Sequence, residues 1–433
     1  MSIREIASTT INKVKRPVGR SRAIGTLTLL LGAFTTFIFG LGSNPASKSI
    51  LTFNPTNLTG VIPPHVGELS VPSKATCLIL GILIIAVGIE ILVRRPAEGL
   101  MVRFGGSAVL FVIGLLIWTV RVPGPAPFGV INMTAVLVGS SPLVMVLVFG
   151  ALSGVMCERA GVVNIAIEGQ FIGGAFFGSM IASTTHSFIL AAFMGALIGA
   201  LLGLLLSFLA LRYLSDQIIV GVVIVTMLAS LSSYLNVQVL SPYPQYNTGD
   251  LAPKLAIPLL AKIPILGPVF FNQNGFFYLM IVLVVVISFA LFKTRYGLHV
   301  RAVGEHPKAA ETVGIDVIKI RYFNVVVGGA IAGIGGVAFI ASYGQFQPGC
   351  TSGLGYIALA ALIFGKWRPS GAVVASIIFG VSVYLANNLQ TYNVPVRSAI
   401  LQTFPYLITI GVVAGLIGRV RAPAADGQPY KRD

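Results

Sequence analysis

Residues 188–211, FILAAFMGALIGALLGLLLSFLAL, form an uninterrupted apolar run without a single charged side chain. A transmembrane α-helix needs about 20 such residues. The whole chain has the same character: 55% of its 433 residues are hydrophobic, 10% are charged, and the mean hydropathy is +0.90. A soluble domain carries about 25% charged residues. The composition therefore excludes an ordinary soluble enzyme or a disordered protein and predicts a polytopic membrane protein.

Eleven further apolar runs flank this one, and most of them approach spanning length. The full set is 24–41, 75–93, 105–120, 133–156, 162–182, 188–211, 218–240, 276–292, 323–341, 354–364, 371–386 and 399–418. The runs lack the alternating pattern of barrel strands, so they predict helices. Residues 354–364 are too few to span a bilayer and predict a half-helix or a re-entrant segment. We expect an all-α polytopic membrane protein with about 10–12 transmembrane helices, one or two of them broken or re-entrant.

The basic residues indicate the topology. If the N-terminus is cytoplasmic and successive runs alternate, all but six of the 29 Lys and Arg residues lie inside. The six outside are Lys48, Lys74, Arg121, Lys254, Lys262 and Arg397. This is the asymmetry of the positive-inside rule, and it predicts cytoplasmic N- and C-termini. The net charge of +16 is thereby explained by topology, so we expect no nucleic acid as a partner.

Small residues predict close helix packing. Gly195, Gly199 and Gly203 recur every four residues in one run, and Gly328, Ala332 and Gly336 do so in another. Such stripes let helix backbones approach one another, which is a statement about packing and not about substrate. Two long segments outside the membrane, 42–74 and 241–275, carry few charges. The six prolines of the second exclude a long helix there.

The segment ERAGVVNIAIEGQ (158–170) holds the first candidate site. Asn164 and Glu168 are four residues apart, so in a helix they share a face. An ionisable group inside a span costs a few kcal/mol and tends to face a cavity or a partner. Two interpretations remain open: the pair lines a translocation path, or it bonds to itself or a neighbouring helix as structural glue. Gln170 lies on a different face.

The loop around residues 296–316 holds the second candidate. Pro307 suits the first position of a helix and Gly314 its C-terminal stop. A short cytoplasmic helix lies between them, and its small apolar face comprises Ala309, Ala310 and Val313. This pattern suits docking into a groove on another protein, although an ordinary solvated loop helix would look similar.

Three segments in this order resemble the permease subunits of bacterial ABC importers. They are ERAGVVNIAIEGQ (158–170), GLHVRAVGEHPKAAETVGI (297–315) and GLGYIALAALIFGKWRPSGA (353–372). The branch they resemble serves branched-chain amino acids, ribose-type sugars and nucleosides. The nearest likeness is to nucleoside or simple-sugar permeases that work with a lipoprotein binding protein. The likeness covers about residues 133–418, while 1–130, with three further runs, match less well.

The resemblance implies an organisation and a set of site residues. Residues 1–130 would be an N-terminal extension with about three transmembrane helices, 131–418 the permease core and 419–433 a cytoplasmic tail. Asn164, Glu168 and Gln170 would line the translocation path. The helix that couples the permease to its ATPase would comprise Gly304, Glu305, Pro307, Ala309, Ala310 and Gly314. No catalytic or metal-binding residue is implied.

The resemblance also implies partners and a location. These are one or two ABC ATPase subunits, a second and related permease subunit, a substrate-binding lipoprotein and the lipid bilayer of the bacterial cytoplasmic membrane. The chain itself would hold no cofactor, because ATP and Mg are bound by the ATPase. In agreement, the sequence contains no GxxxxGK[ST] phosphate-binding loop.

Two questions stay open at the level of sequence. An ion-coupled secondary transporter of a small polar solute is the alternative function, since broken helices suit both classes. Proton-driven carriers usually need buried acids or histidines, and this chain offers essentially Glu168. Residues 366–368, Lys-Trp-Arg, would close a broken helix in the resembled permeases, but they also suit an interfacial anchor, which we favour on composition.

Overall fold

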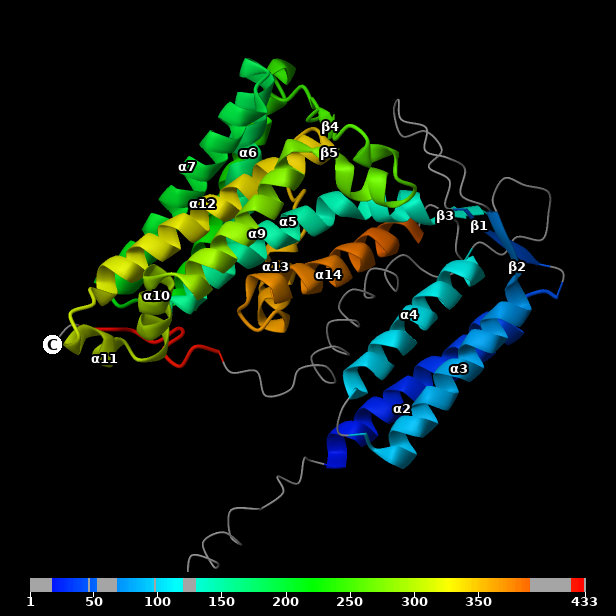
Figure 1. The fold of residues 1–433 in the computed structure, drawn as a ribbon. Coiled ribbons are helices and arrows are strands. Elements are labelled where there is room, and N and C mark those ends of the chain that lie inside the picture. Colours follow the sequence, from blue (N-terminus) through cyan, green and yellow to red (C-terminus); the bar gives the residue numbers. More distant parts are fainter. Residues whose placement is uncertain are drawn as a thin grey trace, which may run out of the picture.

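The computed structural model describes residues 18–45, 47–52, 68–96, 99–119, 130–389 and 422–431 (Figure 1). Most of these residues are helical, and the long helices run between two ends of the molecule. Residues 295–312 and 422–431 lie at the end toward the lower left of Figure 1, called here the lower end. The predicted helix over 399–418 and residues 1–17 lie outside the described residues.

The N-terminal unit combines three helices with a small sheet. The helices are α2 (Val18–Phe34, extended by a π-helical stretch, Thr35–Leu41), α3 (Ser73–Arg94) and α4 (Leu100–Thr119). In the sheet, β1 (Lys48–Thr52) pairs with antiparallel β2 (Glu68–Pro72) and parallel β3 (Val130–Asn132). β3 directly precedes the first core helix, so this sheet joins the N-terminal unit to the rest of the chain.

The core is a bundle of ten helices among the described residues. They are α5 (Met133–Arg159), α6 (Ile167–Thr185), α7 (Phe188–Ser207), α8 (Gln217–Leu235), α9 (Gly275–Lys293), α10 (Arg295–Glu305), α11 (Pro307–Thr312), α12 (Val317–Tyr343), α13 (Leu354–Phe364) and α14 (Pro369–Leu389). π-Helical stretches extend α7 through Phe208–Arg212 and α8 through Asn236–Leu240.

The proline-rich segment between α8 and α9 contains no long helix, as its sequence predicts. It forms short helical turns at Pro244–Tyr246, Leu260–Lys262 and Gly267–Phe271 and an antiparallel hairpin of β4 (Lys254–Ala256) and β5 (Asn272–Asn274). In Figure 1 this hairpin lies opposite α10 and α11, at what we call the upper end.

Eight helices of the described residues are long and apolar enough to cross a membrane. They are α2 with its extension, α3, α5, α7, α8, α9, α12 and α14. Two shorter apolar helices, Arg103–Trp118 within α4 and Leu354–Phe364, accompany them. The all-helical class is confirmed, with five short strands at the upper end, and α13 matches the predicted half-helix 354–364.

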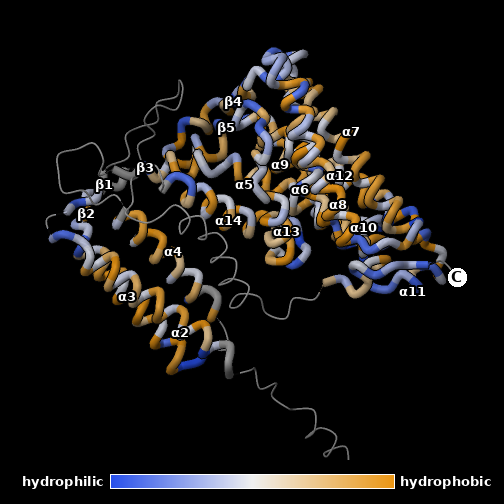
Figure 2. Tube along the Cα trace, turned by 180° about the vertical axis from the view of Figure 1, so that it is seen from behind, coloured by the Kyte–Doolittle hydropathy of each residue, from blue (hydrophilic) through white to orange (hydrophobic). Residues whose placement is uncertain are grey.

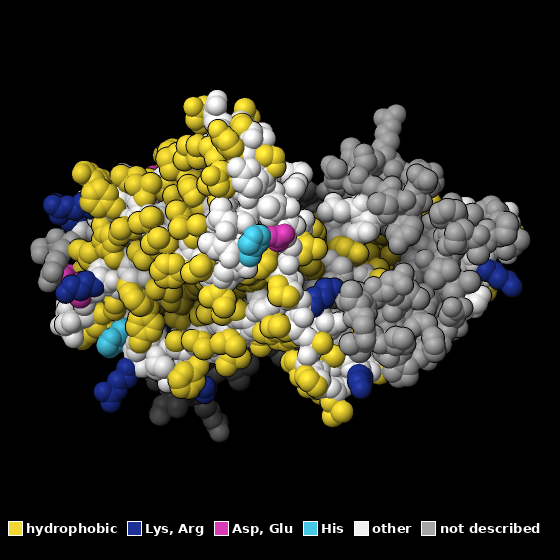
Figure 3. Space-filling model, turned by 90° about the horizontal axis from the view of Figure 1, so that it is seen from above, with side chains coloured by type: hydrophobic (Ala, Val, Ile, Leu, Met, Phe, Trp, Pro, Cys, Tyr) yellow, Lys and Arg dark blue, Asp and Glu magenta, His cyan; other side chains and the backbone are white. Residues whose placement is uncertain are grey.

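The sides of the bundle are apolar where they are exposed. On α7 the exposed side chains include Ile189 and Phe193, and on α9 they include Val285 and Phe289. Figure 2 shows hydrophobic colouring along the long helices and hydrophilic colouring around α10 and α11. Figure 3 shows one broad, continuous hydrophobic surface. Monomeric soluble proteins rarely expose such a surface, and a lipid bilayer covers it.

The predicted glycine stripe of α7 packs against Gly329 and Gly333 of α12. A Cβ atom placed on Gly199 would overlap the carbonyl oxygen of Gly329, and one on Gly195 would overlap that of Gly333. The stripe Gly328, Ala332 and Gly336 faces elsewhere, since Gly328 meets Ser153 and Cys157 of α5 and Gly336 meets Phe171 of α6. The glycines of α12 therefore allow close packing against α7 on one face and against α5 and α6 on another. This places α12 at the centre of the core.

The N-terminal unit contacts the core along α14. Leu116 of α4 and Leu385 of α14 are buried in one small apolar cluster. The contact leaves the opposite side of the core, formed by α7 and α8, free of the N-terminal unit (Figure 1).

Candidate functional site

The chain turns back into the bundle after α5 and starts α6 inside it. Ile167, the first residue of α6, packs beside Gly150 and Gly154 of α5. These glycines precede the end of α5 at Arg159 by about 1.5 to 2.5 helical turns. Residues 160–166 are therefore a non-helical, re-entrant segment. The predicted helix 162–182 is wrong over its first five residues, because the chain takes a left-handed conformation at Gly161 (φ +84°).

A second segment enters from the upper end and meets the first at Glu168. Residues 344–353 leave the top of α12 and lead to the start of α13. The Glu168 carboxylate accepts hydrogen bonds from the Thr351 hydroxyl (2.6 Å), the Gly353 N–H (2.9 Å) and the Gly355 N–H (2.6 Å). It is 5% exposed. Glu168 thus caps the N-terminus of α13, where unpaired N–H groups favour a negative charge.

Gly355 permits this junction. A Cβ atom at that position would lie 2.5 Å from the backbone nitrogen and 2.6 Å from the Cα of Glu168. A larger residue would therefore push the start of α13 away from the start of α6. The two broken segments are held together by one carboxylate and one glycine.

Asn164 and Gln170 form a separate buried pair. Asn164 donates to the side-chain oxygen of Gln170 (3.1 Å) and to the Ser153 hydroxyl (3.2 Å) of α5. The Oδ1 atom of Asn164 and the Nε2 atom of Gln170 have no hydrogen-bond partner among the described residues. Unpaired buried polar atoms are uncommon in proteins, so these two atoms are candidates for contact with a further polar group.

The predicted shared helix face of Asn164 and Glu168 is therefore wrong. Asn164 precedes α6 and points to α5, whereas Glu168 is in the first turn of α6 and bonds to the segment before α13. The structure brings Asn164 together with Gln170, which the helical spacing had separated. The three residues occupy one layer of the core, but on two sides of the start of α6.

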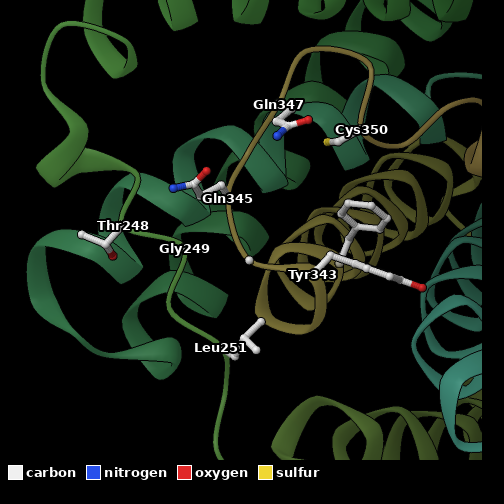
Figure 4. A pocket seen from close by; sticks show the side chains of 9 residues that line it. Thr248, Gly249, Leu251, Tyr343, Gln345, Gln347 and Cys350 are labelled. Atoms are coloured by element: carbon white, nitrogen blue, oxygen red, sulfur yellow. The ribbon is translucent and has the colours of Figure 1, made fainter. Parts of the chain in front are cut away.

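A cavity of about 520 Å³ opens above the Glu168 junction. Its lining comes from the top of α12, the segment that follows, and the loop between α8 and β4: Phe339, Tyr343, Gly344, Gln345, Gln347, Cys350, Thr248, Gly249 and Leu251. Figure 4 shows Gln345, Gln347 and Cys350 on the same segment, across from Thr248 and Gly249. Cys350 directly precedes Thr351, so the wall of the cavity continues into the Glu168 junction.

The lining combines an aromatic surface with amide groups. The rings of Phe339 and Tyr343 lie 4.8 Å apart at an interplanar angle of 32°, and Tyr343 is exposed. Gln345 and Gln347 are also exposed. An aromatic face beside amide donors and acceptors fits a ligand with a flat ring and polar edges. The sequence offered only one signal for this site, two glutamines in the short segment before a half-helix.

α11 at the lower end is the helix predicted between Pro307 and Gly314. Pro307 occupies its first position, and Gly314, with φ +84°, follows its last residue Thr312 after Val313. Gly304 sits at the end of α10 so close to the end of α5 that a Cβ atom would overlap the carbonyl oxygen of Arg159. α10, which leads directly into α11, is thereby held against the end of α5, where the re-entrant segment begins. Glu305 accepts a hydrogen bond from the N–H of Ala424.

The predicted single apolar face of α11 is wrong. Ala310 is 3% exposed and packs with Val303 and Val317 inside this chain, whereas Ala309 is exposed and Val313 is 73% exposed. Adjacent residues of a helix point about 100° apart, which separates Ala309 from Ala310. Val313 follows the last helical residue, so its side chain turns away from the core. The free face of α11 is therefore Ala309 and Val313, without Ala310.

Trp367 does not act as an interfacial anchor. It is 6% exposed, and its indole N–H donates to the Glu158 carboxylate (2.5 Å) at the end of α5. Arg159 donates to the carbonyl oxygen of Trp367 (2.9 Å). Only Lys366 and Arg368 are exposed. Residues 365–368 form a turn between α13 and α14 that is bound to α5, which closes the broken helix at the lower end.

Comparison with known families decides what this architecture is. Residues 136–419 match the family described as branched-chain amino acid transport system / permease component. The chain belongs to this family. It is a multi-pass membrane protein and a permease component of an ABC transporter, not a catalytic subunit.

Curated relatives cover the same part of the permease. The nucleoside ABC transporter permease protein NupC of Lactococcus lactis is 36% identical over 306 residues, 68% of this chain and 94% of the relative. The guanosine ABC transporter permease protein NupQ of Bacillus subtilis is 38% identical over 69% of this chain and 96% of the relative. The putative glucose ABC transporter permease protein TsgC13 of Haloferax volcanii is 30% identical over 66% of this chain and 94% of the relative. No solved structure matches the permease.

Proposed function

We propose that this permease moves nucleosides into the cell as the membrane subunit of an ABC importer. The observation that carries the proposal is the junction at Glu168, where re-entrant segments from the two ends of the bundle meet below a cavity with aromatic and amide walls. Two curated relatives at 36% and 38% identity are described as nucleoside and guanosine permeases. A nucleoside has the flat ring and polar edges for which the cavity is shaped.

In this proposal a solute enters at the upper end and passes the junction. Tyr343, with Gln345 and Gln347, would receive the nucleobase by stacking and hydrogen bonding. Glu168 would act as the gate, because its hydrogen bonds close the core between the two segments. Asn164 and Gln170 lie in the same layer, and their unpaired polar atoms are available to a solute once the junction opens.

The energy would come from a separate ATPase that docks on α11. The chain has no phosphate-binding loop of the GxxxxGK[ST] type, and ATP and Mg would be bound by the ATPase, so the permease itself needs no cofactor. Val313 and Ala309 form a small apolar surface at the lower end, beside Lys308. Exposed apolar residues on a short helix that directly follows α10 fit a groove in a partner.

We propose the topology and organisation that the basic residues and the family resemblance indicate. The lower end would be cytoplasmic, with both chain ends on that side and about 10–12 helices in all, one or two of them broken or re-entrant. Residues 1–130 would be an extension, 131–418 the permease core and 419–433 a tail. The exposed α7 and α8 would face lipid. A second, related permease and a substrate-binding lipoprotein would complete the importer, the lipoprotein seated on the upper end.

The function is tested by transport into proteoliposomes with the ATPase and the binding lipoprotein. We expect uptake of radiolabelled guanosine to need ATP inside the vesicle and to persist when ionophores collapse the ion gradients. Uptake that follows an ion gradient and needs no ATPase would establish the secondary transporter instead.

A simple sugar is the second candidate, because the relative TsgC13 is described as a putative glucose permease. Competition by unlabelled glucose, ribose and four nucleosides in the same assay separates the two. Inhibition by nucleosides alone supports the nucleoside permease. Inhibition by glucose alone supports a sugar permease instead. Tyr343→Ala should lower guanosine uptake more than sugar uptake, with Ser352→Ala as the control on the same segment.

A further inference from the structure

Residues 422–431 lie against the lower end of the core although they form neither helix nor strand. Pro423, Ala425 and Tyr430 are buried, while their neighbours Ala424, Gln428 and Lys431 are exposed. Because three of its ten residues are buried, the segment is docked on the core and is not a solvated tail. We call this segment the strap.

The strap explains a buried arginine of α12. Arg321 is 0% exposed, and an unpaired charge in such a place would be strongly unfavourable. Its guanidinium donates to the carbonyl oxygens of Gln428 (3.0 Å) and Ala425 (3.5 Å) and lies 5.7 Å from the centre of the Tyr430 ring. Among the described residues, the Arg321 side chain donates hydrogen bonds to the strap alone.

The strap also binds α10 and α11. The N–H of Ala425 donates to the carbonyl oxygen of Gly304 (2.9 Å) at the end of α10. The Tyr430 hydroxyl donates to the carboxylate of Glu311 on α11, and the Tyr430 ring packs with Ala310. The buried side of α11 is therefore covered by the strap, which fixes where its free face points.

On its other side the strap touches the re-entrant segment after α5. A Cβ atom on Gly161 would lie 2.8 Å from Arg321 and 3.1 Å from the carbonyl oxygen of Ala425. One on Gly427 would lie 3.3 Å from Val163, next to Asn164. The strap thus spans from α11 to the segment that leads to Asn164 and Glu168.

We propose that the strap is a mechanical link that couples movement of α11 to the re-entrant segment 160–166, with Arg321 and Tyr430 as its positioning residues. The proposal rests on the proposed docking of the ATPase to α11. It assigns the strap a role in transmission and leaves the ATPase contact to the free face of α11. Loss of the strap then uncouples hydrolysis from transport without dissociating the ATPase.

The test uses the whole importer in proteoliposomes and compares three variants of the strap. Tyr430→Ala removes the ring and the bond to Glu311, Tyr430→Phe removes only the bond, and Lys431→Ala changes an exposed neighbour as the control. The readout is solute transported per ATP hydrolysed, measured on equal amounts of assembled complex. We expect Tyr430→Ala to lower this ratio at least tenfold, Tyr430→Phe to lower it less, and Lys431→Ala to keep the wild-type ratio.

A wild-type ratio for Tyr430→Ala would overturn the proposal. So would loss of the ATPase from that variant, because the strap would then belong to the docking surface. Hydrogen exchange at the Ala425 N–H gives a second measurement in the assembled complex: Tyr430→Ala should increase it and Lys431→Ala should not, and equal protection in both would contradict the link. Failure of the proposed function is recognised separately, because the wild-type complex would then show no ATP-dependent uptake.

Discussion

The Oε2 atom of Glu168 accepts a hydrogen bond of 2.6 Å from the N–H of Gly355, 187 residues later in the chain. This bond joins the first turn of α6 to the first turn of α13. Both helices start inside the core, so their first N–H groups are removed from water and need an acceptor. One carboxylate provides it for α13, and this makes the junction sensitive to a single substitution.

Glu168→Ala is expected to impair uptake and to lower the stability of the junction. Each buried donor left without a partner costs about 1–3 kcal/mol. Thr351→Ala, which removes one of the three donors, should have a smaller effect, and Ser352→Ala is the matched control because its hydroxyl is exposed and bonds only to Gly349 nearby. Uptake and thermal unfolding in detergent are the measurements. Wild-type uptake by Glu168→Ala would remove Glu168 from the translocation path.

Gly199→Ala should destabilise the core by about 1–3 kcal/mol, since the added methyl group overlaps the backbone of Gly329. Gly105→Ala on α4 is the control, because a Cβ atom there meets no other atom within 4 Å. It should be neutral or stabilise the helix by up to about 1 kcal/mol. A thiol-reactive dye can follow unfolding, since the thiols of Cys77 and Cys157 are buried and belong to no disulfide. Equal melting temperatures for the two variants would contradict the close approach of α7 and α12.

Val313→Glu and Ala310→Glu are expected to impair the importer in different ways, the first through ATPase binding and the second through docking of the strap. A carboxylate at the exposed Val313 should weaken ATPase binding tenfold or more, about 1.4 kcal/mol, while the permease keeps its melting temperature. A carboxylate at the buried Ala310 should displace Tyr430 and expose the strap to protease. Co-purification of the ATPase and limited proteolysis separate the outcomes. Normal ATPase binding by Val313→Glu would show that the docking surface lies elsewhere.

Docking of the strap should weaken as the pH rises. Burial raises the pKa of Asp426 from its ordinary value of 3.8 to about 7, although the nearby Arg321 charge opposes this shift and Glu158 shares a hydrogen bond with it. A raised pKa means that the docked state binds the proton more tightly than the free strap. The protonated Asp426 therefore stabilises docking most fully below about pH 4. This stabilisation is lost as the pH rises through 7. Protease cleavage of the strap at pH 6 and pH 8 measures it, and Asp426→Asn should flatten the difference. Faster cleavage of the wild-type strap at pH 6 than at pH 8 would contradict this prediction.

The helices were predictable because hydropathy alone defines a span. Helix α13 agrees with the predicted half-helix at both ends, since Gly353 and Gly365 flank it. The start of α6 was missed, because residues 162–166 are mostly apolar, as a helical span would be. The left-handed Gly161 and bonds from Val163 and Asn164 to other helices accompany their irregular path. The local sequence pattern carries no information about contacts with residues that are distant in the chain.

The buried polar residues of the core were predictable in identity more than in geometry. Glu168 and Gln170 were selected as polar residues in an apolar run, and both are buried in the layer where the broken segments meet. The orientation of Ala310 was missed, because the residue that covers it, Tyr430, is far away in the chain. The cavity was missed for the same reason: Thr248 and Gln345 come together only after α9 and α12 have folded between them.

At its centre the contact of α7 with α12 is formed by backbone on backbone, because Gly195, Gly199, Gly329 and Gly333 meet there. Surfaces of this kind neither slide nor repack in small steps. We expect the pair to move as one rigid unit in any rearrangement of the core. Movement within the core would then be concentrated in the irregular segments at 160–166 and 344–353, in step with α11 and the strap.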